Sequence, residues 1–345
     1  MTVVRKIALL AAGAVALGAA AQQGTTFHVT KTIPLGIDGG WDYVTFDPEA
    51  GRLFISRGGA SLVQVVDLKS GKLSGTIDST RGVQGIVLAP ELGRGFTSNG
   101  GDSTVTIFDL KSLKQVAKVT VTGRNPDAIL YDPYSKRVFT FNHTGHNTTA
   151  IDAATGKVLG TAKTDGTLET GQSDLAGNIY VNDEEGNRLF VFDAKTLEVK
   201  ATWPMTGCTA PTGLAIDRAH KRLFASCNES KTMAVVDYTT GKTVASPAIC
   251  AGADAAAFDN GLQLVFASCG DGNITVIHED SPDKYTVVGN ATTEARARTM
   301  TIDEKTHTLY TVTAQYNTQT PPAGGGGRGR ATMVPGSFHV LVLER

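Results

Sequence analysis

The chain repeats one pattern of hydrophobic and polar residues along its length. Each unit has a short apolar strand, a polar turn and a second apolar strand that ends in an aromatic residue. Seven segments share the pattern: VTFDPEAGRLFI (44–55), IVLAPELGRGFT (86–97), ILYDPYSKRVFT (129–140), GQSDLAGNIYV (171–181), GLAIDRAHKRLFA (213–225), AAFDNGLQLVFA (256–267) and MTIDEKTHTLYT (300–311). The turn residues are 42 to 44 positions apart: Asp47, Ala89, Asp132, Asp174, Asp217, Asp259 and Asp303. Self-similarity at this period is typical of proteins in which each repeat forms one sheet of a β-propeller.

A third strand follows the hairpin, as in VQVVDLKSGK (63–72) and VTIFDLKSLK (105–114). Alternating Val, Ile, Thr and Phe residues predict this strand, and the Asp after them predicts a tight turn whose backbone N–H groups the carboxylate accepts. We therefore interpret five carboxylates as turn residues rather than acids in a site: Asp67, Asp109, Asp152, Asp193 and Asp237. A fourth strand, for example VAKVTV (116–121), leads to the next unit.

The last unit has only three strands of its own, at 299–313 and in SFHVLVL (337–343). The segment TTFHVTKTIPLG (25–36) matches the pattern of a fourth strand and precedes the first inner strand. Pairing the two chain ends would close the ring and leave only short, protected sheet edges. The sequence therefore predicts an all-β fold, a seven-bladed β-propeller of four-stranded antiparallel blades closed by strand 25–36 in the C-terminal blade.

Two longer stretches resemble a known family. NIYVNDEEGNRLFVFDAKTLEVKATW (178–203) and RVFTFNHTGHNTTAIDAATGKVLG (137–160) are similar to the YVTN-type repeats of the YncE-like bacterial β-propellers. The resemblance extends over essentially the whole chain after the N-terminal segment and implies a propeller built of WD40-like repeats. It says little about chemistry, because the shared residues are those of turns and core.

The N-terminus has the pattern of a secretory signal peptide. A basic pair, Arg5 and Lys6, precedes an apolar stretch from Ile7 to about Ala20, and small residues follow up to Ala21. A membrane anchor is the alternative, but it needs about 18–20 apolar residues and this stretch is shorter. We expect residues 1–21 to be removed and residues 22–345 to form one propeller domain, periplasmic or secreted, with no membrane span. The formal net charge of −1 and the 41% of hydrophobic residues are ordinary for such a domain.

The four cysteines follow the same repeat. Cys208 and Cys250 are 42 residues apart, as are Cys227 and Cys269, and each hairpin has one cysteine nine residues before its turn Asp and one ten after it. Cys208–Cys227 and Cys250–Cys269 are therefore the natural disulfides, although spacing alone does not exclude the other two connectivities. Each would stabilise the fold by about 3 kcal/mol. A zinc or redox site is less well supported, because the sequence has no C-x-x-C motif.

One face of the propeller should carry a ring of polar side chains. The loop before each inner strand and the loop between the second and third strands emerge on that face, at the mouth of the central channel. The residues five positions before the turn residues should lie there at one height: Asp42, Gln84, Asp127, Glu169, Thr212, Asp254 and Arg298. The ring could simply be hydrated, or it could bind a polar small molecule, a cation or the basic tip of a partner. Its mixed charge argues against a dedicated metal cup, so we expect neither a metal nor a cofactor.

Further residues are expected at the rim of this mouth. Arg57, Arg81 and Arg124 should add positive charge, and the H-x-x-H motif of His143 and His146 could ligate a metal or act in acid–base chemistry. The repeat places both histidines on an outer loop, where solvation is the simpler interpretation. The Gly- and Pro-rich segment 313–337 should be a flexible loop on the mouth face, and a lid is one role for it.

These patterns favour an exported, non-catalytic propeller that binds a small polar ligand or a periplasmic protein at the channel mouth, as a monomer. The sequence has no nucleophile motif, complete metal signature or cofactor fingerprint, and the nearly neutral chain makes nucleic acid an unexpected partner. A hydrolase or lyase of the lactonase type remains open, with Glu169, His143, His146 and Arg298 on the appropriate face. An accessory role for periplasmic redox enzymes, delivering or shielding a metal or quinone, is a third hypothesis without positive support.

Overall fold

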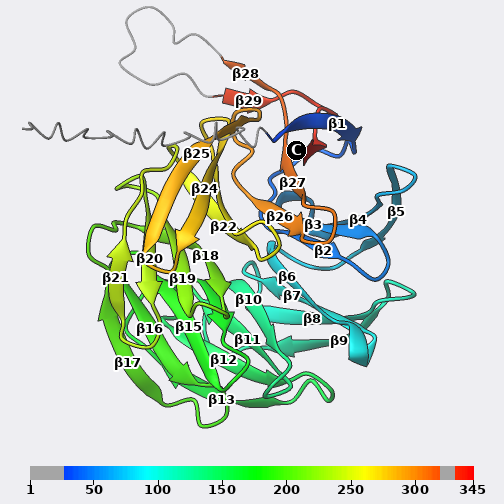
Figure 1. Ribbon diagram of the computed structural model, residues 1–345. Helices are drawn as coiled ribbons and strands as arrows, with labels where there is room; N and C mark the ends of the chain where they lie inside the picture. The colour runs from blue at the N-terminus through cyan, green and yellow to red at the C-terminus, as the bar shows by residue number, and fades with distance from the viewer. Residues whose placement is uncertain (1–26, 319–330) are drawn as a thin grey trace, which may run out of the picture.

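The computed structural model describes residues 27–318 and 331–345, so the predicted signal peptide and the Gly-rich centre of segment 313–337 lie outside it. The described chain forms seven four-stranded antiparallel sheets around a central axis, together with one two-stranded hairpin (Figure 1). The predicted seven-bladed β-propeller is confirmed. Within the described ranges, no helix has the length and apolar character needed to cross a bilayer.

Blades 1 to 6 follow one another along the chain, and each runs from its innermost to its outermost strand. Blade 1 contains β2 (Val44–Asp47), β3 (Arg52–Arg57), β4 (Leu62–Asp67) and β5 (Lys72–Ile77). Blade 2 contains β6 (Val83–Ala89), β7 (Arg94–Asn99), β8 (Thr104–Asp109) and β9 (Gln115–Thr120). Blade 3 contains β10 (Pro126–Asp132), β11 (Arg137–Asn142), β12 (Asn147–Asp152) and β13 (Val158–Lys163).

The second half of the ring follows the same order. Blade 4 contains β14 (Leu168–Ser173), β15 (Asn178–Asp183), β16 (Arg188–Asp193) and β17 (Val199–Pro204). Blade 5 contains β18 (Pro211–Asp217), β19 (Arg222–Cys227), β20 (Thr232–Asp237) and β21 (Lys242–Ala245). Blade 6 contains β22 (Ala253–Asp259), β23 (Leu264–Cys269), β24 (Asn273–Ser281) and β25 (Lys284–Thr292). Short 3₁₀ helices, η1 (Gly58–Ala60) and η2 (Pro90–Leu92), lie in blades 1 and 2.

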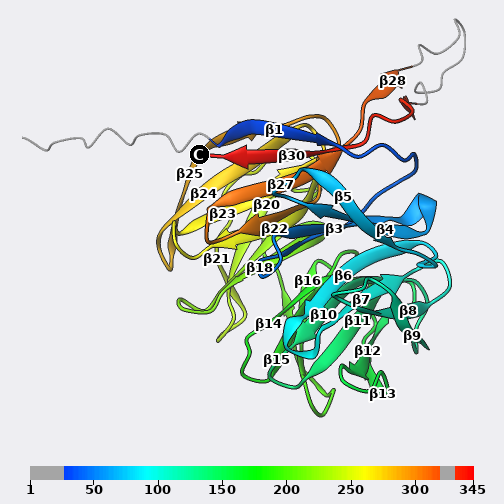
Figure 2. The same cartoon turned by 90° about the vertical axis from the view of Figure 1, so that its right-hand side faces the viewer.

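Blade 7 joins the two ends of the described chain. It contains β26 (Met300–Asp303), β27 (Thr308–Thr313), β30 (His339–Glu344) and, outermost, β1 (His28–Pro34). β1 runs antiparallel to β30, with His28 opposite Glu344 and Pro34 opposite His339 (Figure 2). Each inner strand contacts the next around the axis, and β26 contacts β2, so the ring is complete. The predicted closure is confirmed.

The core lies between neighbouring blades. The second and third strands are buried on both faces because each blade packs against two others, which explains why they read as nearly continuous apolar runs. Aromatic side chains fill these interfaces. Phe54 and Phe108 join blades 1 and 2 with ring centroids 5.8 Å apart, and Phe139 and Phe192 join blades 3 and 4 edge to face at 5.7 Å. Such pairs stabilise by about 0.5–1.5 kcal/mol beyond the area they bury.

The turn aspartates act as predicted. The carboxylates of the five third-strand aspartates each accept a backbone N–H within the following turn at 2.7–2.9 Å, from Ser70, Ser112, Thr155, Thr196 and Thr239. These hydrogen bonds hold the turns that follow the third strands. The five carboxylates therefore act in turns and are not part of the channel site.

Both disulfides that the cysteine spacing favoured are present. Cys208 pairs with Cys227 and Cys250 with Cys269, with Cα–Cα distances of 5.3 and 5.8 Å. Each links the loop before an inner strand to the end of the second strand in the same blade. The two bonds therefore fasten the mouth ends of blades 5 and 6.

Segment 313–337 differs in part from the predicted loop. Its ends pair as a hairpin of β28 (Tyr316–Thr318) and β29 (Ala331–Met333), while residues 319–330 are outside the described ranges. Tyr316 and Met333 pack against the hydrophobic core between blades 7 and 1, and the rings of Trp41 and Tyr316 lie 6.5 Å apart. Apolar contacts with the body of the propeller thus give the two ends a strand pairing that the Gly and Pro content did not indicate.

Candidate ligand site at the channel mouth

The ring positions lie at irregularities of the inner strands. In blades 2 to 6 the register between the first and second strands shifts across the ring residue: Gln84, Asp127, Glu169, Thr212 and Asp254. A β-bulge leaves a residue outside the ladder and redirects its side chain. In blades 1 and 7 the ring residues, Asp42 and Arg298, precede the inner strand by two positions. The hydrogen-bond ladder between the first and second strands is therefore interrupted, or has not yet begun, at the positions where the sequence predicted the ring.

Serines of the second strand support this geometry. The hydroxyl of Ser98 accepts the N–H of Gly85 at 2.8 Å, and that of Ser226 accepts the N–H of Gly213 at 3.0 Å. In blade 1, Ser56 accepts the N–H of Asp42 at 3.1 Å. Buried backbone groups require a partner, and these hydroxyls provide one where the ladder is interrupted.

Arg298 joins two ring acids from different blades. Its guanidinium bonds to Asp254 of blade 6 and lies 3.7 Å from the carboxylate of Asp42 in blade 1. The two acid side chains keep 22–23% of their surface exposed. Burial, with the charge of Asp254, raises the pKa of Asp42 to about 7 although Arg298 opposes the shift. Burial also raises the pKa of Asp254.

A second group gathers Asp127, His143 and Glu169. His143 Nδ1 lies 2.9 Å from Glu169 Oε1, and the three residues offer donor atoms that are all within 4.8 Å of one another. With its amide nitrogen turned toward Asp127, Gln84 is 3.3 Å from both carboxylate oxygens. Burial raises the pKa of Asp127 well above its usual value, and the charges of Glu169 and Asp42 add to the shift.

The placement of the two histidines corrects the sequence interpretation. His143 is not confined to an outer loop, because the turn between β11 and β12 lies beside the start of β14 and brings its imidazole to Glu169. His146 is exposed, and its Nδ1 lies 3.0 Å from the carbonyl oxygen of Gly166. The H-x-x-H motif therefore contributes one histidine to the channel and not a pair.

Two further residues at the mouth were not expected from the sequence. The hydroxyl of Tyr43 is 3.3 Å from that of Thr170, and its pKa is raised by burial and by the charges of Asp127 and Glu169. Glu184, in the turn between β15 and β16, has a pKa raised by burial, and its charge helps to raise that of Glu169. Glu184, like His143, lies in the loop between the second and third strands of its blade. An alignment of these loops between repeats would have indicated that Glu184 also lies at the mouth.

Two of the expected rim and ring residues, Arg57 and Thr212, are not available to a ligand in the expected way. Arg57 is fully buried and does not add charge to the rim. Thr212 is also buried, and its hydroxyl donates to the carbonyl of Ala253 at 3.1 Å. Arg81 and Arg124 are exposed, as expected of rim residues.

The site thus combines five carboxyls with one arginine and one histidine. The carboxyls are Asp42, Asp127, Glu169, Glu184 and Asp254, and burial raises the pKa of each. Crowded acids shift in this way because each disfavours the charge of its neighbours, and an added positive charge relieves the repulsion. The arrangement can therefore exchange protons for a cation.

No protein-family model matches this sequence, and no curated protein matches it. In structure the chain is similar to a chain in the "Crystal Structure of Mitotic Checkpoint Complex", with a TM-score of 0.72 and 13% sequence identity. The similarity covers 89% of this chain and 95% of that one. At this identity the likeness shows the β-propeller fold alone.

Proposed function

We propose that this protein is an exported, non-catalytic β-propeller of the YncE-like class whose channel mouth binds a small, positively charged ligand. The observation that carries the proposal is the excess of half-buried carboxyls over cationic groups among the described residues of the mouth. Two disulfides support export, because such bonds persist in oxidising compartments.

A divalent cation is the simplest ligand for this site. Asp127 and Glu169 offer carboxylate oxygens and His143 offers an imidazole nitrogen, a donor set suited to divalent metal ions. An organic ligand with an ammonium group has the same charge and would meet the same carboxylates. Arg298 leaves the opposite side of the mouth less negative, which favours a ligand that also carries a polar or anionic group there.

The double variant Asp127→Asn, Glu169→Gln should lose the cation site. Titration calorimetry of the wild type with Mn²⁺, Zn²⁺ and a linear diamine at neutral pH should give binding by at least one of them, and the variant should weaken it by at least roughly tenfold. A matched double variant of exposed acids, Asp78→Asn with Glu198→Gln, has the same net charge and should bind like the wild type. Unchanged affinity in the first variant would exclude the channel mouth as the site.

The same binding should depend on pH with a defined sign. Because the ring acids have raised pKa values, cation binding must release protons, so affinity should fall as the pH is lowered from about 7 toward 4. In the absence of a cation, the raised pKa of Asp42 stabilises the fold fully below its unfolded value of 3.8, and this contribution is lost as the pH rises through about 7. Affinity that rises at low pH would contradict the proposal.

Catalysis of hydrolysis or elimination is a second candidate, favoured by the contact of His143 with Glu169 inside the channel. A carboxylate that orients an imidazole is a usual arrangement for general acid–base catalysis, which contributes about 10²–10⁴-fold to a rate. If the chain opens sugar lactones in the presence of a divalent cation, His143→Ala should reduce the rate by roughly 100-fold and His146→Ala should not. A panel of lactones without turnover, or equal rates in both variants, would remove this candidate.

A further inference from the structure

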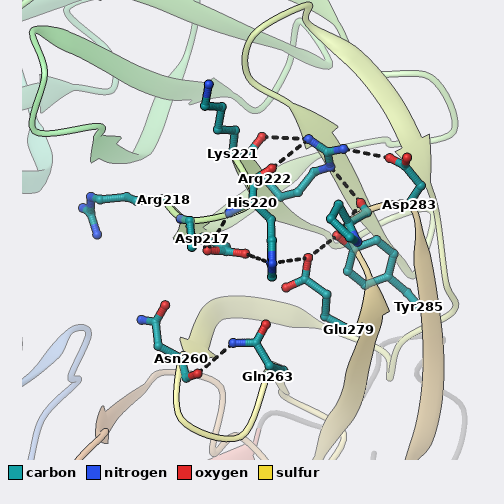
Figure 3. Close-up of polar contacts among 12 residues, drawn as sticks. Asp217, Arg218, His220, Lys221, Arg222, Asn260, Gln263, Glu279, Asp283 and Tyr285 are labelled. Carbon is teal, nitrogen blue, oxygen red and sulfur yellow. Dashed lines mark hydrogen bonds and ion pairs between the residues drawn. The ribbon is translucent and has the colours of Figure 1, made fainter.

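A separate cluster of metal-type donors lies at the opposite end of the blades. Asp217 ends β18 and His220 lies in the turn between β18 and β19 of blade 5, and Glu279 reaches them from β24 in blade 6 (Figure 3). His220 Nδ1 is 2.7 Å from Asp217 Oδ2 and 3.4 Å from Glu279 Oε1. The side chains of Asp217 and Glu279 are completely buried, whereas His220 keeps 39% of its side-chain surface exposed.

Glu279 departs from the pattern of the other blades. Its backbone N–H bonds to the carbonyl of the hairpin turn of its own blade, and the same bond identifies the equivalent residues of blades 1 to 5: Leu68, Leu110, Ala153, Ala194 and Tyr238. None of these is an acid. Burying a carboxylate lowers the stability of the fold unless the carboxylate is paired. Blade 6 therefore has a destabilising residue at a position where blades 1 to 5 have none.

The surrounding residues compensate for the two buried acids only in part. Glu279 Oε1 accepts the hydroxyl of Tyr285 at 3.0 Å, but Oε2 is buried and has no hydrogen-bond partner among the described residues. Asp217 uses Oδ1 for the amides of its own turn, while Oδ2 faces His220. The nearby Arg222 bonds instead to Asp283 at 2.7 Å and to the carbonyl of Pro282. One imidazole thus serves two buried carboxyls.

We propose that Asp217, His220 and Glu279 bind a divalent transition metal ion of the zinc type, which joins blade 5 to blade 6. Two carboxylate oxygens and one imidazole nitrogen are zinc ligands, and bonds of about 2.0–2.2 Å in a tetrahedral site separate the donors by roughly 3.3 Å. The observed 3.4 Å between His220 and Glu279 agrees with this separation, and the 2.7 Å between His220 and Asp217 would widen by roughly 0.6 Å.

The next blade interface provides an internal control. His307 Nδ1 lies 2.7 Å from the buried carboxylate of Asp259, which repeats the His–Asp contact between blades 6 and 7. Within the described part of the chain, this pair belongs to no cluster of three metal-type donors. The pair alone should not hold a metal ion.

The test measures zinc in the metal-stripped full chain by calorimetry and by elemental analysis after dialysis. We expect Glu279→Gln and His220→Ala each to lose one equivalent of bound Zn²⁺, while His307→Ala keeps it. The double variant Asp127→Asn, Glu169→Gln should also keep it, so failure here is distinguishable from failure at the channel mouth. Co²⁺ should give the visible spectrum of a tetrahedral site in the wild type and lose it in Glu279→Gln.

A second variant separates metal loss from misfolding. Glu279→Leu places the residue of blades 1 and 2 at this position, so the chain should fold and yet bind one Zn²⁺ less than the wild type. Zinc bound at this site should raise the melting temperature of the wild type, and this rise should be absent in Glu279→Leu. Equal zinc stoichiometry in the wild type and both Glu279 variants would overturn the proposal and leave the two acids as a carboxyl pair that shares a proton.

Discussion

Replacing Arg57 with methionine should lower the free energy of unfolding by about 3–5 kcal/mol. The guanidinium is fully buried at the end of β3, and it donates to Gln64 and to the carbonyls of Gly36, Ile37 and Gly39. It also lies 3.5 Å from the ring centroid of Phe338. Methionine fills similar space but donates no hydrogen bond, so these carbonyls would be left buried without a partner.

The charge of Arg57 persists in spite of its burial. Desolvation lowers its pKa to about 10, so the side chain is still protonated at neutral pH and makes charge-assisted hydrogen bonds. Urea denaturation followed by tryptophan fluorescence would measure the loss. Arg81→Met is the matched control, because Arg81 is exposed and its replacement should change stability by less than about 0.5 kcal/mol. An Arg57→Met variant as stable as this control would show that the segment after β1 does not depend on the guanidinium.

Arg57 also shows where sequence reasoning ends. The period of 42 to 44 residues predicted the blades, their closure and the height of the ring, because these follow from counting positions along strands. Whether an arginine at the end of a second strand points to water or into the protein depends on the segment that packs over it. Residues 35–39 lie in the connection from β1 to β2, and the period of the repeat could not show that carbonyls of this connection converge on the guanidinium.

The ring was predicted in position but not in its interactions. Spacing placed Asp42, Asp254 and Arg298 at one height, and Arg298 of blade 7 does pair with both acids, from blades 1 and 6. Spacing did not show that His143 turns from its loop toward Glu169, since this depends on how one blade's turn packs against the next inner strand. Glu279 was missed for a related reason. It stands in a longer hairpin of blade 6, HEDSPDK (278–284), where His278 occupies the position of the third-strand aspartate of blades 1 to 5.

Removal of β1 is the second change that should strongly lower the free energy of unfolding. A variant that begins at Gly36 lacks the strand that covers β30, and it loses the burial of Phe27 and Ile33, which are 3% and 1% exposed. Burying two such side chains contributes about 3–6 kcal/mol, before the lost ladder hydrogen bonds are counted. We expect a large fall in unfolding free energy together with self-association, because an unpaired β30 presents free backbone groups to another chain.

The closing strand can be supplied separately, which makes this prediction specific. A peptide of residues 25–36 added to the shortened chain should restore the monomer in size-exclusion chromatography and recover part of the lost stability, because β30 selects it by register and by the pocket for Ile33. The same peptide with Ile33 replaced by Asp should not do so, since an uncompensated charge would enter the interface between blades 7 and 1. A shortened chain that remains monomeric and equally stable would instead mean that contacts between the inner strands hold the ring closed without β1.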